Sequence, residues 1–198
     1  MSMIENWFFV LAMLAVLLLP GPTNALLASS THQYGFLKTL AFLPVKWLGY
    51  VYGIALWALF IHLFSPIWPA LGWLLHIASV LYVLWLAFHL WKRSHLQQYE
   101  QHHLQLRKSQ LFLSTLKNPK TLLLVAGVLP EETWNSAENA LLVMGIFSLL
   151  LMPVSIFWML FGRALLTENV IGLHADHLYK GSVMLLLICM LPMIFRFF

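Results

Sequence analysis

Long apolar segments are the feature that most constrains how this chain can fold. Six stretches, each roughly 20 residues long, could cross the hydrocarbon core of a bilayer as helices. They cover approximately Trp7–Leu27, Leu40–Phe64, Pro69–Trp91, Leu111–Leu129, Ala140–Phe161 and Leu178–Phe198. The sequence therefore predicts an all-α integral membrane protein with about six transmembrane helices, embedded in a lipid bilayer.

The composition excludes an ordinary soluble domain. Of 198 residues, 61% are hydrophobic and only 9% are charged, whereas soluble domains carry about 25% charged residues. The 14 Phe, 9 Trp and 6 Tyr suit a membrane protein, because amphipathic rings favour the headgroup boundary. The net charge of +4 then bears on membrane topology, and we expect no nucleic-acid partner.

The basic residues predict an orientation, since Lys and Arg in short loops are retained on the cytoplasmic side. Eight of them would lie on one side of the membrane: Lys38, Lys92, Arg93, Arg107, Lys108, Lys117, Arg163 and Lys180. Arg196 alone would lie on the other, with Lys46 and Lys120 assigned to neither side. We therefore expect a multi-pass protein with both termini outside the cytoplasm.

One long polar loop divides the single transmembrane domain, residues 1–198, into two halves. The loop, residues 92–110, reads KRSHLQQYEQHHLQLRKSQ and separates a first half at 1–91 from a second half at 111–198. Each half has three predicted spans. If the halves are related in structure, an odd number of spans makes the second half inverted, an arrangement common in secondary transporters.

The first predicted span is interrupted by the sequence PGPTN. Pro20 and Pro22 lack backbone donors and clash with carbonyls one turn earlier, and Gly21 between them adds freedom, so the helix should kink or unwind. Open backbone inside a membrane is tolerated where protein or a water-filled cavity meets it. Thr23 and Asn24 follow with a hydroxyl and an amide. A solute site is one interpretation, and a plain packing kink is the other.

A second interruption, NPK, falls in the fourth predicted span. Asn118, Pro119 and Lys120 lie at a depth of roughly 10 Å from its basic end, and Pro20 lies about equally deep in the first span, so the two breaks can meet. Lys120 either reaches the headgroups or points into a cavity. Lys46 is a further cation near the inner end of the second span. Interfacial anchoring is its expected role, and attraction of a carboxylate is the alternative.

Together these features resemble the LysE/RhtB family of amino-acid exporters. The resemblance comprises PGP with Asn two residues later, NPK in the fourth span, six spans in about 200 residues and a basic loop between the halves. By position, its motif residues are Pro20, Gly21, Pro22, Asn24, Asn118, Pro119 and Lys120. The resemblance implies efflux of amino acids or similar small metabolites across a bacterial inner membrane, driven by the proton gradient or the membrane potential. No cofactor is expected.

The chain also departs from that family. Thr23 stands where many relatives have Asn or Asp, and the second span begins FLPVKWLGY where many have a small, Gly-rich start. No Asp or Glu lies inside the six predicted spans, so an obvious proton carrier is missing. The histidines nearest the membrane are His62, His76 and His89, for which interfacial or packing roles are the simpler interpretation.

Three alternatives to amino-acid export remain. His95, Glu100, His102 and His103 suggest a divalent-metal exporter of the same superfamily, although adjacent histidines on a helix diverge by about 100°, and we predict no metal site. An enzyme is disfavoured, because no nucleophile turn motif, paired Asp or HExxH occurs. A non-transporting membrane receptor or assembly protein is the third alternative. A homo-oligomer is compatible with all of them.

Overall fold

The computed structural model describes residues 3–19, 21–92 and 107–166, and every regular element in these ranges is helical. The elements are α1 (Met3–Leu18), α2 (Pro22–Tyr34), α3 (Phe36–Leu40), α4 (Leu43–Phe64), α5 (Ala70–Lys92), α6 (Lys108–Leu116), α7 (Pro119–Leu123), the π-helical turn η1 (Leu124–Val128), the 3-10 turn η2 (Glu131–Trp134) and α8 (Ala137–Leu166). The predicted all-α class is confirmed. The predicted sixth span, Leu178–Phe198, lies outside the described residues.

Two or three helices in the described ranges could cross a membrane. Phe36–Phe64 and Ala137–Phe161 are each long and apolar enough. Phe9–Leu18 and Pro22–Tyr34 would form a third span as a pair bent by 54°. The helices Ala70–Tyr82 and Pro119–Val128 are apolar but shorter. The structure therefore supports a membrane protein, whereas the predicted number of six spans is not confirmed.

The predicted fourth span, Leu111–Leu129, is not one continuous helix. α6 ends at Leu116 and α7 begins at Pro119, because proline has no N–H to continue a helix and its ring clashes with the preceding turn. The Asn118 side chain caps the new start by accepting a hydrogen bond from the Lys120 amide, 3.1 Å away. The predicted interruption at NPK is confirmed, and the π-helical turn that follows it was not predicted.

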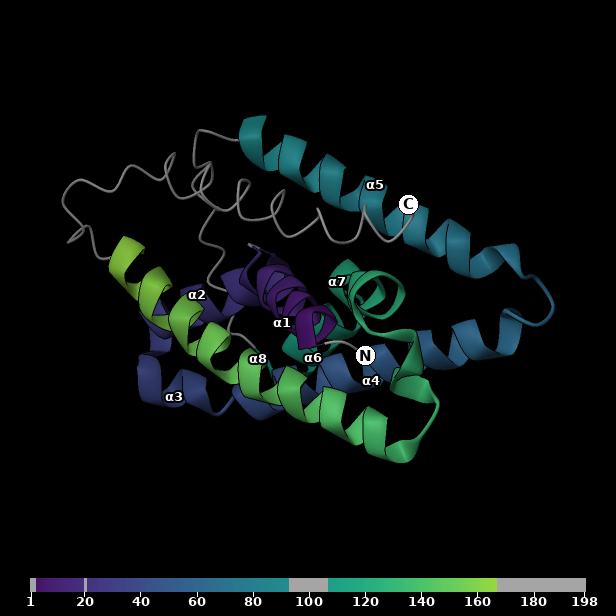
Figure 1. Ribbon diagram of the computed structural model, residues 1–198. Coiled ribbons are helices and arrows are strands. Elements are labelled where there is room, and N and C mark those ends of the chain that lie inside the picture. The colour runs from purple at the N-terminus through teal and green to yellow at the C-terminus, as the bar shows by residue number, and fades with distance from the viewer. Residues whose placement is uncertain (1–2, 20, 93–106, 167–198) are drawn as a thin grey trace.

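The described helices form a bundle in which α2 packs along α8 and α4 packs along α6. In Figure 1, α5 and α8 run along opposite edges of the bundle. Two glycines let α4 approach its neighbours closely. A Cβ at Gly49 would lie 2.7 Å from Cβ of Thr115, and a Cβ at Gly53 would lie 2.9 Å from Cγ2 of Thr121.

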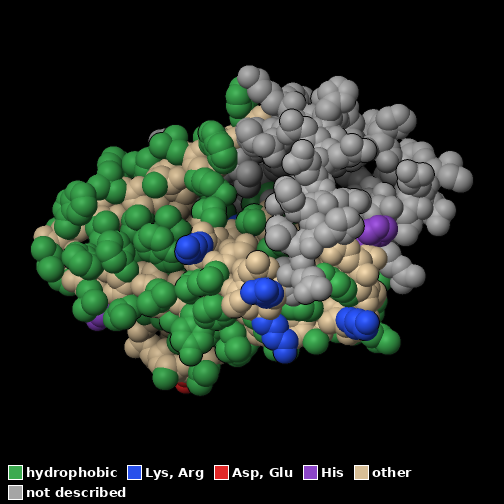
Figure 2. All heavy atoms as spheres, turned by 180° about the vertical axis from the view of Figure 1, so that it is seen from behind, with side chains coloured by type: hydrophobic (Ala, Val, Ile, Leu, Met, Phe, Trp, Pro, Cys, Tyr) green, Lys and Arg blue, Asp and Glu red, His purple; other side chains and the backbone are tan. Residues whose placement is uncertain are grey.

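The outer surface of the bundle is largely apolar. Large side chains such as Leu141 and Leu149 of α8 are 75% and 73% exposed, which suits contact with lipid tails. Figure 2 shows hydrophobic side chains over much of one face, with Lys and Arg gathered in one part of it. Lys38, Lys108 and Lys117 are exposed, so these charges lie at the surface of the bundle.

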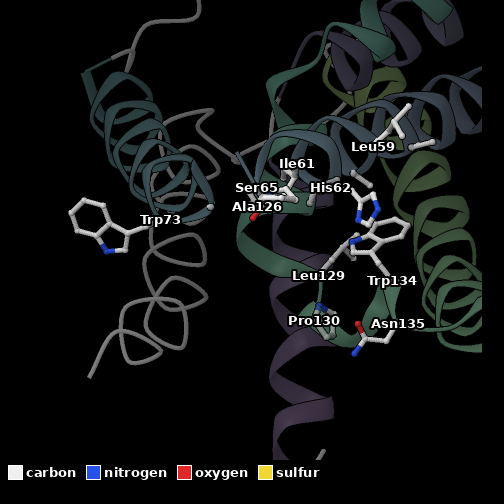
Figure 3. A pocket seen from close by; sticks show the side chains of 15 residues that line it. Leu59, Ile61, His62, Ser65, Trp73, Ala126, Leu129, Pro130, Trp134 and Asn135 are labelled. Atoms are coloured by element: carbon white, nitrogen blue, oxygen red, sulfur yellow. The ribbon is translucent and has the colours of Figure 1, made fainter. Parts of the chain in front are cut away.

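A half-open cavity of about 1150 Å³ lies between α4, α5, η1 and η2 (Figure 3). Its polar lining includes His62, Ser65 and Asn135, and its apolar wall includes Val125 and Leu129. The rings of His62 and Trp134 lie near each other in Figure 3, whereas Trp73 lies apart from them on α5. Among the residues that the structure describes, no predicted site residue lines this cavity.

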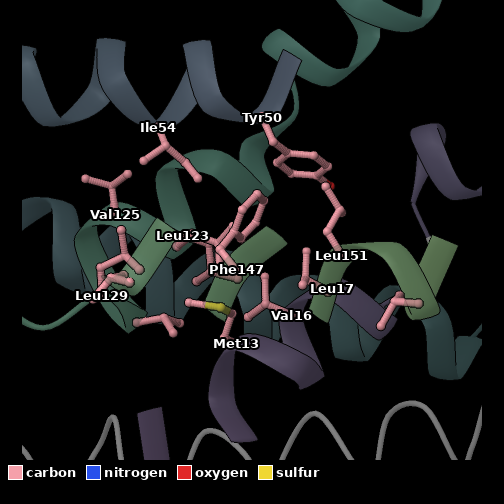
Figure 4. Packing of buried hydrophobic residues seen from close by; sticks show 14 of the residues in the cluster. Met13, Val16, Leu17, Tyr50, Ile54, Leu123, Val125, Leu129, Phe147 and Leu151 are labelled. Atoms are coloured by element: carbon pink, nitrogen blue, oxygen red, sulfur yellow. The ribbon is translucent and has the colours of Figure 1, made fainter. Parts of the chain in front are cut away.

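Two apolar clusters form the interior of the bundle. The large apolar cluster (Figure 4) comprises Met13, Val16, Leu17, Leu19, Tyr50, Ile54, Leu123, Leu124, Val125, Val128, Leu129, Val143, Phe147, Leu151 and Val154. Its aromatic pair, Tyr50 and Phe147, meets edge to face with ring centroids 5.6 Å apart. The small apolar cluster comprises Leu27, Leu43, Leu111 and Met159. On α4 and on α8 the two clusters occupy successive stretches.

Candidate functional site

The first helix break is closed by a side chain from the helix that follows it. α1 ends at Leu18 and α2 begins at Pro22, so the predicted kink is confirmed. Pro20 itself lies outside the described residues. The Asn24 amide donates to the carbonyls of Leu17 and Leu19, at 3.1 and 3.0 Å. In a continuing helix, backbone N–H groups would donate to these two carbonyls. The Asn24 amide therefore replaces backbone donors that are lost at the break.

The second break reaches the first through Asn118. Its amide nitrogen lies 3.3 Å from the Thr23 hydroxyl and 3.4 Å from the Tyr50 hydroxyl, and it donates to both. Its backbone carbonyl accepts a 2.7 Å hydrogen bond from the Thr121 hydroxyl. Asn118 is therefore held from several sides, and it joins α2, α4 and the start of α7.

Lys120 joins the two breaks directly. Its side chain is 2% exposed, and its Nζ donates a hydrogen bond to the carbonyl of Leu19. A Cβ at Gly21 would lie 3.0 Å from Lys120 Cε and 3.2 Å from Nζ, so the lysine occupies the space that this glycine leaves free. The expectation that the breaks meet is confirmed. Of the two alternatives for Lys120 the inward one applies, whereas Lys117 is exposed.

Lys46 is buried, so the anchoring role expected for it is wrong. It is 1% exposed, and its Nζ donates to Oδ1 of Asn24 at 2.8 Å and to Oγ of Ser155 at 2.9 Å. Leu43, Lys46 and Tyr50 follow at helical spacing and share the face of α4 that packs into the bundle. That register turns the lysine inward instead of toward the headgroups.

These contacts form one continuous chain of hydrogen bonds. It runs from Ser155 through Lys46 and Asn24 to the Leu19 carbonyl, which also accepts from Lys120. The chain connects α8, α4, α2, the end of α1 and α7. Asn118 adjoins this chain by accepting from the Lys120 amide, and it donates to Thr23. We call these six buried side chains the polar layer: Thr23, Asn24, Lys46, Asn118, Lys120 and Ser155.

Sequence reasoning missed Ser155 and Tyr50. Ser155 follows Pro153 by two residues inside an apolar helix, the same spacing that separates Asn24 from Pro22 and Lys46 from Pro44. A polar residue two positions after a proline in a long apolar segment was therefore the available signal. Tyr50 carried no comparable signal, because several other tyrosines occupy similar apolar surroundings.

The polar layer is enclosed at both ends by apolar side chains. Along α4, Lys46 lies between Leu43 of the small apolar cluster and Tyr50 of the large one. Along α8, Ser155 lies between Val154 of the large cluster and Met159 of the small one. All six members of the layer are buried. The arrangement is that of a polar compartment closed to water on two sides.

The two lysines of the layer lack a counter-charge within the described part of the chain. No carboxylate among the described residues forms an ion pair with either; their hydrogen-bond acceptors are neutral oxygens of Asn24, Ser155 and Leu19. A buried ammonium without a counter-charge is costly, and polar groups retained at such cost inside membranes are commonly functional.

The histidine candidates do not join the polar layer in the described ranges. His62 is exposed beside the cavity. His95, Glu100, His102 and His103 lie outside the described residues, as do the side chains of His76 and His89. Within the ranges that the structure describes, no three His, Cys, Asp or Glu side chains are grouped so that they could hold a metal ion.

Comparison of the chain with known protein families, with curated proteins and with solved structures finds no match. The resemblance to LysE/RhtB exporters therefore rests on the two proline motifs and on the span layout. The geometry of the polar layer is an independent observation.

Proposed function

We propose that this protein is a secondary transporter of the LysE/RhtB type that exports amino acids or similar small metabolites across a bacterial inner membrane, with the polar layer as its solute site. One observation carries the proposal: two helix breaks meet at a buried polar compartment that has an apolar seal at each end. Broken helices that meet near mid-membrane are how many secondary transporters build substrate sites.

The two apolar clusters lie on opposite sides of the polar layer. This arrangement is compatible with alternating access, in which the layer opens to one side of the membrane at a time. The small apolar cluster has four buried residues, and the large one has fifteen. Lys38 and Lys108 come a few residues before Leu43 and Leu111 of the small cluster. In the orientation expected from the basic residues, the small cluster is therefore the cytoplasmic seal, and a solute would enter through it.

In this proposal the cavity between α4, α5, η1 and η2 lies on the exit side of the solute pathway. It borders Val125 and Leu129 of the large apolar cluster, and it is also lined by Asn135, which lies between the exposed Glu132 and Glu138. In the same orientation it faces away from the cytoplasm. A solute that passes the large cluster would reach this cavity before it reaches the outer medium.

Flux from proteoliposomes tests the proposal. Vesicles would be loaded with labelled amino acids, organic acids or divalent metals, and efflux would be followed under an imposed proton gradient or membrane potential. Gly21→Val places a branched side chain where Lys120 lies, so flux per folded molecule should fall strongly. Gly145→Val is the matched control, because nothing lies within 4 Å of a Cβ at Gly145.

The possible outcomes distinguish the exporter of organic solutes from a metal exporter and from a non-transporting protein. Solute flux that Gly21→Val abolishes and Gly145→Val preserves supports the exporter. Flux of a divalent metal in place of organic solutes would reassign the substrate to the metal class. Folded protein that moves no solute under either driving force contradicts the exporter and favours a receptor or assembly protein.

A further inference from the structure

We infer that the solute held by the polar layer is a dicarboxylate, whose two negative charges would be bound by the amines of Lys46 and Lys120. The inference rests on the proposed function, because it names the substrate class for the same site. It narrows that class from small metabolites in general to organic dianions.

Charge favours a dianion at the polar layer. The polar layer contributes two lysines and, within the described residues, no carboxylate partner for them. A dianion would neutralise both lysines. A neutral amino acid brings an ammonium group together with its carboxylate. Its net charge is zero, so the excess positive charge of the two lysines would stay in place. A divalent metal ion would be repelled by both lysines, and repulsion between like charges is strong where water is excluded.

The two lysine amines also reach the same helix break. Lys46 donates to Asn24, Asn24 donates to the Leu19 carbonyl, and Lys120 donates to the same carbonyl. The two amines therefore converge on one helix break from α4 and α7. Their present acceptors are neutral oxygens, whereas a carboxylate would add the attraction between opposite charges to each hydrogen bond. Carboxylate oxygens would thus compete well for both amines.

The start of α2 adds a further group that favours anions. This 13-residue helix begins at Pro22 with no side-chain cap, so the N–H groups of Thr23 and Asn24 lack intrahelical acceptors. The N-terminal end of a helix carries partial positive charge and favours anions. It adds to the two lysines at the same break, and the Thr23 and Ser155 hydroxyls provide further donors nearby.

Thermal unfolding with small probes tests the inference on purified, full-length protein in nanodiscs. Succinate is the dianion, succinamide is its neutral isostere, 1,4-diaminobutane is a dication, and leucine is a neutral amino acid. Succinate alone should raise the unfolding midpoint by several degrees at saturation. Equal stabilisation by succinamide or leucine, or none by succinate, would overturn the inference.

Variants assign the effect to the two lysines. Lys46→Met and Lys120→Met should each abolish stabilisation by succinate, whereas Lys117→Met, which removes an exposed lysine beside the same break, should keep it. Lys46→Gln and Lys120→Gln retain hydrogen bonding without charge, and they serve if a Met variant does not fold. Succinate stabilisation that survives loss of charge at both positions would place the anion elsewhere and contradict the assignment.

Counterflow of labelled succinate in proteoliposomes separates this inference from the proposed function. Stabilisation by succinate without flux of any solute would support the anion site and contradict the exporter. Leucine flux without stabilisation by succinate would support the exporter and contradict the dianion. Succinate flux that disappears in Lys46→Gln and persists in Lys117→Met supports both the dianion site and the exporter function.

Discussion

Lys120 lies in the space that Gly21 leaves free: a Cβ at Gly21 would come within 3.0 Å of Cε and 3.2 Å of Nζ of the lysine. The two residues belong to breaks that are far apart in the sequence. The glycine of PGP and the lysine of NPK therefore form a complementary pair that joins the two breaks.

Gly21→Ala should impair transport more than stability. The added Cβ displaces the end of a flexible lysine, so the cost in folding should be about 1 kcal/mol or less. Lys120 should lose its bond to Leu19, and flux should fall by about tenfold if that bond positions the amine. Flux per folded molecule and the thermal midpoint would be measured together. Gly145→Ala is the control, and wild-type flux in Gly21→Ala would contradict the role given to Lys120.

Lys46→Met should leave the free energy of unfolding within about 1 kcal/mol of wild type, or increase it, while transport is lost. Replacing a buried ionisable group by an apolar group of similar volume is often neutral or stabilising, and here it also removes a buried amine that no described carboxylate pairs with. Unfolding in detergent would be monitored by tryptophan fluorescence. A loss of several kcal/mol would instead identify Lys46 as a structural link between α2, α4 and α8.

Gly49→Ala should destabilise the bundle. Its Cβ would lie 2.7 Å from Cβ of Thr115 and 3.2 Å from the backbone oxygen of Phe112, so α4 and α6 must separate. Overpacking of this kind commonly costs about 1 to 3 kcal/mol. The unfolding midpoint should fall, whereas Gly72→Ala, with nothing within 4 Å of the new Cβ, should leave it nearly unchanged. Equal midpoints for the two variants would show that α4 and α6 pack less closely than described.

Leu111→Ser should open the small apolar cluster to water. A cysteine at Ser155, placed in a Cys189→Ser background, reports on access to the polar layer, and it should be unreactive toward water-soluble maleimide while Leu111 is present. Reaction should speed up in Leu111→Ser from the cytoplasmic side only. Leu113→Ser, which alters a side chain 49% exposed on the same helix, is the control. Fast reaction in the control or in the parent would mean that the layer is not sealed there.

The expected orientation can be tested by labelling in intact spheroplasts. In the same Cys189→Ser background, an impermeant thiol reagent should modify a cysteine at Ser136 and spare one at Gln98. Lysis should then expose the second position, which confirms that its thiol is reactive. The reverse pattern would invert the topology and would turn the proposed exit cavity toward the cytoplasm.

The helical class and the two breaks could be predicted from the sequence, because both follow from local properties of the chain. Apolar segments of bilayer length form helices that satisfy their own backbone, and a proline lacks its N–H in any surroundings. Pro119 therefore removes a backbone donor whatever packs against it, and together with the Asn118 cap it starts a new helix, whereas α8 continues through Pro153. The π-helical turn at Leu124–Val128 has no such local cause in the sequence, and we have no physical account of it.

Only the tertiary structure decided where the polar side chains point. Lys46 near the start of α4 was compatible with headgroup anchoring, and its burial follows from partners 22 and 109 residues away, Asn24 and Ser155. Such contacts depend on which helix faces pack together, and the sequence pattern along any one helix does not specify that. The sequence by itself determined that the chain is helical and apolar and that its helices break at PGP and NPK. The packing of α2, α4, α7 and α8 decided that those breaks meet around two buried lysines.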